Sequence, residues 1–65
     1  MIGNYAVNTD FGGATFETEH DAISAFSLVA QYHDIEINKD QVRKILEKEG
    51  YYEANAFLAI TGSLA

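Results

Sequence analysis

Residues 4–18 read NYAVNTDFGGATFET, and they set the start of the fold. Short β-forming runs occupy 4–8 and 14–18, and TDFGG at 9–13 separates them. Asp10 can hydrogen-bond within its own turn, and the two glycines tolerate a positive φ. The pattern therefore predicts a β-hairpin whose turn covers residues 9–13.

Two helices are predicted after this hairpin. Thr18 is suited to cap a helix over 19–33, in which apolar residues recur at spacings of three and four. Asn38 can cap a second helix, and Gln41 is placed to complete a capping box. Gly50 stands where a glycine commonly ends a helix. The second helix carries only a narrow apolar stripe, so one side of it faces the core.

The tail at 51–65, YYEANAFLAITGSLA, fits a strand or a helix. As a strand it would place five alternating side chains on one face: Tyr52, Ala54, Ala56, Leu58 and Ile60. A strand is favoured, because an isolated two-stranded hairpin is only marginally stable. The predicted fold is a single α+β domain over residues 1–65, in the order ββααβ, with an antiparallel three-stranded sheet covered by two helices.

Apolar packing must hold this fold together. The chain has 65 residues and no Cys, so it has neither disulfides nor the Cys pairs of a structural zinc site. A hydrophobic content of 48% argues against disorder. The spacings predict a core of seven side chains: Phe16, Ile23, Phe26, Val42, Ile45, Leu46 and Leu58.

The charge distribution is strongly acidic. Ten acidic residues face four basic ones, for a net charge of −6, and all four bases lie within 39–48. This balance opposes direct binding of nucleic acid. It fits either a solvated surface that keeps a small protein in solution or a surface for a basic partner. Six acidic residues are the candidate partner-binding set. Asp10, Glu17, Glu19 and Asp21 form the first patch, and Asp34 and Glu36 form a second.

The sequence gives little support for a catalytic site, a metal site or a membrane-spanning segment. His20 and His33 lie thirteen residues apart on one predicted helix, so their rings do not converge. Glu17, Glu19 and Asp21 lack the glycine and closing Glu of a calcium loop. No motif for zinc or phosphate binding is present. We therefore expect no enzyme activity, no cofactor and no metal. Without a signal peptide or a long apolar segment, a cytoplasmic location away from membranes is expected.

Three stretches together resemble a known family. They are VNTDFGGATF at 7–16, the helix end Tyr32-His33-Asp34, and IEINKDQVRKI at 35–45. They resemble the small acidic phage anti-CRISPR proteins that inhibit a type I CRISPR surveillance complex. The resemblance implies the ββααβ fold and carboxylates that occupy a basic DNA-binding site. Of that family's acidic residues only Asp10 has a counterpart here. Four expected acidic positions hold other residues: Ala25, Phe26, Ala30 and Gln31.

Two weaker resemblances remain open. LVAQYHDIEINKDQVRKIL at 28–46 resembles the degenerate peptidase-like domain at the N-terminus of bacterial ABC exporters, where Asp21 would replace the active-site Cys. The chain has half the length of that domain. INKDQVRKILEKEGY at 37–51 resembles the recognition helix of a helix-turn-helix regulator, although the preceding turn is too long.

The favoured hypothesis is a phage or mobile-element inhibitor. It would block a basic nucleic-acid-binding site on a host protein complex by DNA mimicry, as a monomer or a homodimer. The alternatives are an interaction or dimerisation module, such as part of an exporter docking domain, and a helix-turn-helix regulator.

Overall fold

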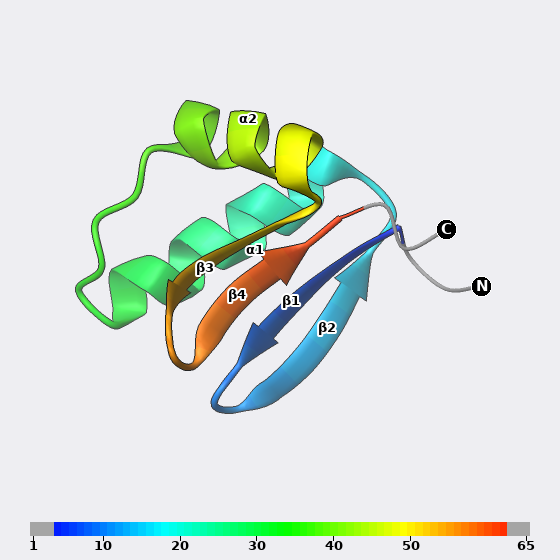
Figure 1. The fold of residues 1–65 in the computed structure, drawn as a ribbon. Helices are drawn as coiled ribbons and strands as arrows, with labels where there is room; N and C mark the ends of the chain where they lie inside the picture. The colour runs from blue at the N-terminus through cyan, green and yellow to red at the C-terminus, as the bar shows by residue number, and fades with distance from the viewer. Residues whose placement is uncertain (1–3, 63–65) are drawn as a thin grey trace.

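Six regular elements make up the chain in the computed structural model, which describes residues 4–62. In chain order they are β1 (Tyr5–Thr9), β2 (Gly12–Phe16), α1 (Glu19–Tyr32), α2 (Lys39–Glu49), β3 (Tyr51–Asn55) and β4 (Leu58–Thr61). The strands form one antiparallel sheet in the order β2-β1-β4-β3. Helix α1 lies along one face of this sheet, and α2 packs against α1 and β3 (Figure 1). The α+β class is therefore confirmed.

Within residues 4–62 the sheet has four strands, so the predicted three-stranded sheet in the order ββααβ is close to the observed fold but lacks one strand. The tail is a strand-forming segment, as expected, but it folds into the hairpin β3–β4. The chain reverses at Ala56 and Phe57, where the Phe57 N–H donates to the Asn55 side-chain oxygen at 2.9 Å. Ala56 is consequently exposed in a turn and does not share the face of Leu58. The order is ββααββ.

The first hairpin is confirmed, with a shorter turn than predicted. Thr9 pairs with Gly12, so only Asp10 and Phe11 form the turn. The Thr9 hydroxyl closes it by accepting from the Phe11 N–H and donating to the Gly12 carbonyl, both at 3.0 Å. Gly12 has φ 128°, a backbone conformation that suits glycine. The Asp10 carboxylate is therefore not needed to hold the turn.

Both predicted N-caps are confirmed. The Thr18 hydroxyl accepts from the Asp21 N–H at 3.2 Å, and the Asn38 side-chain oxygen accepts from the Gln41 N–H at 3.1 Å. Within residues 4–62 the Gln41 side chain does not return the bond that a capping box requires. Gly50 ends α2 in the left-handed conformation, with φ 86°, as its position predicts.

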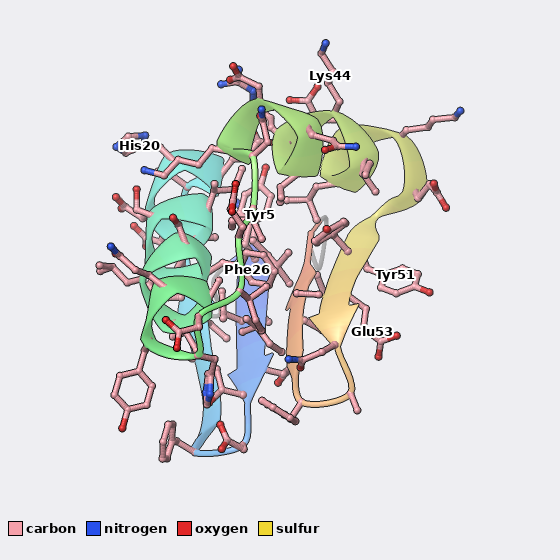
Figure 2. The ribbon with its side chains drawn as sticks, turned by 90° about the vertical axis from the view of Figure 1, so that its left-hand side faces the viewer. Tyr5, His20, Phe26, Lys44, Tyr51 and Glu53 are labelled. Carbon is pink, nitrogen blue, oxygen red and sulfur yellow. The ribbon has the colours of Figure 1, made fainter. Side chains whose placement is uncertain are left out.

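The core lies between the sheet and the two helices. Nine of the hydrophobic residues that the structure describes are buried in it: Val7, Ala22, Ile23, Phe26, Ala30, Val42, Leu46, Leu58 and Ile60. Five of the seven predicted core residues are among them, whereas Phe16 and Ile45 are only half-buried. The fully buried Phe26 ring projects from α1 toward the sheet (Figure 2) and meets the Tyr52 ring edge-on at 5.9 Å.

Candidate functional site at the hairpin end

Both hairpin turns lie at the same end of the molecule as the C-terminus of α1 (Figure 1). Side chains from three separate segments therefore meet there. We call this surface the hairpin end and define it by six residues: Asp10, Phe11, Tyr32, His33, Asp34 and Phe57. Ring contacts and one ion-pair contact link the first turn, the helix end and the second turn.

The rings of the hairpin end are unusually exposed for their size. Phe11 is 74% exposed, Tyr32 is 73% exposed and Phe57 is 45% exposed. The Phe11 ring centre lies 6.1 Å from that of Tyr32 and 6.2 Å from that of His33. The His33 ring also meets Phe57 edge-on at 5.2 Å. A cluster of exposed apolar rings on so small a protein indicates a surface for interaction.

His33 joins the rings to an acidic side chain. It is the C-cap residue of α1 and is half-buried. Its Nε2 lies 3.4 Å from Asp10 Oδ1. That Nε2 is buried and has no hydrogen-bond partner with acceptable geometry in the part of the chain described. The Asp10 side chain is 42% exposed, so its carboxylate can still accept hydrogen bonds from a partner.

Asp34 completes the hairpin end in a conformation that rarely suits a side chain. Its φ is 59°, the left-handed region in which helices commonly end on glycine. The helix end is closed by the backbone, because the Ile35 N–H donates to the Ala30 carbonyl at 2.7 Å. Asp34 therefore contributes a carboxylate at a position where the backbone alone favours glycine.

We expect Asp34→Gly to raise the free energy of unfolding by about 0.5–1 kcal/mol, because the strain of a left-handed Asp is removed. Chemical denaturation would measure this change. Asp34→Asn is the matched control. Asn tolerates the same conformation, so that variant should unfold like the parent. A loss of stability in Asp34→Gly would show that the Asp34 side chain supports the fold.

The six predicted acidic residues separate into two groups. Asp10 and Asp34 belong to the hairpin end. Asp34 and Glu36 line an open groove of about 410 Å³ between the last turns of α1 and the segment 34–37. The other three lie at or just before the first turn of α1: Glu17, Glu19 and Asp21. A helix of 14 residues is about 20 Å long. Asp10, Asp34 and Glu36 near its C-terminal end therefore cannot form one site with the three acidic residues near its start.

The basic residues lie away from the hairpin end. All four Lys and Arg residues lie on α2, and Figure 2 shows that helix, with Lys44, opposite the hairpin turns. Lys39 and Arg43 share a pocket with Glu19 near the start of α1. Arg43 also pairs with Asp40 at 2.8 Å, which is the only ion pair of a Lys or Arg within residues 4–62. The carboxylates of the hairpin end therefore have no Lys or Arg beside them.

Glu19 has a further carboxylate as its neighbour. Partial burial and the Glu47 carboxylate raise the pKa of Glu19 above its usual value, while Arg43 acts in the opposite direction. Because the pKa of Glu19 is higher in the folded state than in the unfolded chain, its contribution to stability is fully present at pH values below its pKa in the unfolded chain. That contribution is lost as the pH rises through its pKa in the folded state.

We therefore expect Glu19→Gln to stabilise the fold at pH 7 by roughly 0.2–0.5 kcal/mol, a small effect because water screens the pair. The gain should disappear at a pH below the usual Glu pKa, where the parent residue is protonated. Thermal unfolding at both pH values would measure it, with Glu17→Gln as the control. A gain that persists at acidic pH would contradict the electrostatic cause.

The part of the chain described shows neither a metal-binding cluster nor a membrane-spanning helix. His20 is exposed at the start of α1 and His33 lies at its end, and no three metal-ligating side chains gather anywhere within residues 4–62. Neither described helix has the length and apolar character required to span a bilayer.

No protein-family model matches the sequence, and the comparisons with curated proteins and with solved structures gave no match.

Sequence reasoning missed the aromatic part of this site. Phe11 offered a signal, because a large apolar side chain in a predicted turn has no core to enter. Tyr32 offered another, since it lies four residues after Leu28 on the side of α1 away from the buried residues, and both are exposed. Phe57 gave none, because the turn that exposes it was not predicted.

Proposed function

We propose that this protein is a non-enzymatic inhibitor of phage or mobile-element origin, which binds a basic nucleic-acid-binding site on a host protein complex in the cytoplasm. The hairpin end is its contact surface. The observation that carries this proposal is the joint exposure of aromatic rings and carboxylates without a neighbouring Lys or Arg.

The chemistry of a nucleic-acid-binding site supports this assignment. Such a site uses Arg and Lys to bind phosphates, and Arg planes or aromatic rings to stack on bases. At the hairpin end the exposed Asp10 and Asp34 offer anionic oxygens, and Phe11 and Tyr32 offer exposed rings. An Arg side chain can pair with a carboxylate and stack on a ring at the same time. The hairpin end therefore offers a basic site the same two contacts as nucleic acid does.

A type I CRISPR surveillance complex is the proposed target. The resemblance of the turn around Asp10 to the anti-CRISPR family supports this choice, and the exposed carboxylate of Asp10 is consistent with it. The first-helix positions that are acidic in that family are not acidic here. In this chain the rings beside Asp10 replace those acids as the second part of the contact.

Inhibition of DNA binding tests this function. Purified type I surveillance complexes would be mixed with their target DNA and with increasing protein, and bound DNA would be measured by gel shift. We expect the parent to abolish DNA binding and the Phe11→Ser, Asp34→Asn double variant to restore it. The Glu17→Gln, Asp21→Asn double variant removes two charges at the other end of α1 and should inhibit like the parent. Equal inhibition by both double variants would rule out the hairpin end.

Salt should weaken this binding steeply. Charge complementarity speeds association, and the screening length falls to about 8 Å at physiological ionic strength. We expect the association rate to fall about tenfold or more between 0.05 and 0.5 M salt, as measured by surface plasmon resonance. A rate that does not change with salt would contradict mimicry of nucleic acid and indicate an apolar contact.

A further inference from the structure

The two outer strands of the sheet are protected to different degrees. Strand β3 carries the charged Glu53 and a register shift between Glu53 and Asn55, and Figure 2 shows Tyr51 and Glu53 projecting from it. Charges and bulges on an edge strand discourage pairing with other chains. Strand β2, GGATF, has no charge, no Pro and no register shift. Its outer edge meets no other strand among residues 4–62, so it is the unprotected edge.

The core-facing side of β2 is also incompletely covered. Four of its five residues are exposed, whereas Leu58 and Ile60 of β4 are buried. A groove of about 310 Å³ lies between β2 and α1. Apolar and small residues dominate its lining, among them Val7, Phe11, Gly12, Ala14, Ala25 and Val29. A strand that paired with β2 would cover this groove as well as the free edge.

We propose that a second copy of the chain pairs with β2, antiparallel and about a two-fold axis at Ala14. In this register Ala14 faces its own counterpart, and Phe16 lies opposite Gly12 of the second copy. Gly13 lies opposite Thr15 on the other face. Each large side chain thus faces glycine, an arrangement in which an aromatic ring covers the gap that an edge glycine leaves. Centring the pair on Gly13 or Thr15 would match fewer residues.

A second copy fits this edge better than a basic peptide does. Strand β2 itself carries no charge that would select a cationic segment, and its order of large and small residues is self-complementary. Antiparallel pairing directs the two hairpin ends away from each other. Phe11 belongs to both surfaces, because it also lines the groove beside β2. The two proposals are measured separately, one by the mass of the protein alone and the other by DNA binding of the surveillance complex, so either can fail alone.

Mass measurement at different salt concentrations tests the dimer. The chain has a mass of 7.2 kDa and a net charge of −6, so two copies repel each other at low salt. Sedimentation equilibrium should show the mass rising toward twice the monomer value with protein concentration, and more readily at 0.5 M than at 0.05 M salt. A monomer mass throughout this range would overturn the proposal.

Introduced cysteines test the register, because the chain has none of its own. Facing residues of an antiparallel pair lie about 4.5–5.5 Å apart at Cα, a separation that a disulfide can bridge. Ala14→Cys should form a disulfide-linked dimer under mild oxidation, at least tenfold faster than the exposed turn variant Ala56→Cys. Equal rates would overturn the register.

A matched pair of charge variants provides the final control. Ala14→Glu places like charges opposite each other at the axis and should remain a monomer. Ala56→Glu makes the same change of charge in the second turn and should still dimerise. Circular dichroism would check that both variants are folded. If both variants dimerise like the parent, the interface does not use β2.

Discussion

Phe26→Ala should lower the free energy of unfolding by about 3–5 kcal/mol. The Phe26 side chain is fully buried between α1 and the sheet, and its ring packs edge-on against Tyr52. Small domains have a total stability of about 5–15 kcal/mol, so this loss should leave the variant partly unfolded near body temperature. Chemical and thermal denaturation, followed by circular dichroism, would measure it.

Leu28→Ala is the matched control for this experiment. Leu28 lies two residues further along α1 and is 67% exposed, so its truncation leaves no cavity and should change stability by less than about 0.5 kcal/mol. A Phe26→Ala protein that melts within a few degrees of the parent would mean that α1 presents a different face to the sheet.

Asp10→Asn should weaken partner binding by about 2–5 kcal/mol while leaving the melting temperature unchanged. The Thr9 hydroxyl closes the turn, so the fold does not need the Asp10 carboxylate. Asn keeps the size of the side chain and changes only its charge in the contact with His33. A partner's Arg or Lys would lose its counter-charge. Titration calorimetry with the target complex would measure this loss.

Glu17→Gln removes one charge at the opposite end of α1 and is the control for overall electrostatics. It should retain most of the affinity, because long-range attraction alone is weakened. Full affinity in a normally folded Asp10→Asn protein would show that Asp10 does not contact the partner and serves only as a turn residue.

Local signals predicted most of the secondary structure. The caps at Thr18 and Asn38 and the glycine at Gly50 act within one turn of a helix, so the sequence pattern is sufficient to find them. The turn after Asn55 was missed because it uses neither Gly nor Pro, and its stabilising bond comes from the Asn side chain. Without that turn, the alternation of 51–61 is indistinguishable from one long strand.

The candidate site could not be predicted in the same way. It requires Phe11, His33 and Phe57 to meet, and these belong to three segments separated by more than twenty residues each. Their meeting depends on the strand order β2-β1-β4-β3 and on the direction of α1 across the sheet. The acidic residues near the start of α1 were grouped with Asp10 because sequence spacing gives no information about which end of a helix a hairpin turn reaches.

Backbone amide shifts during titration with a short arginine-rich peptide would show directly whether the hairpin end receives cationic side chains. A ¹⁵N-labelled protein and a hexapeptide of arginines require no knowledge of the natural partner. We expect the largest shifts at residues 10–12, 32–34 and 56–58, and their loss in the Phe11→Ser, Asp34→Asn double variant. Shifts that are largest at residues 17–21, or spread evenly over all acidic residues, would contradict the hairpin end as the contact surface.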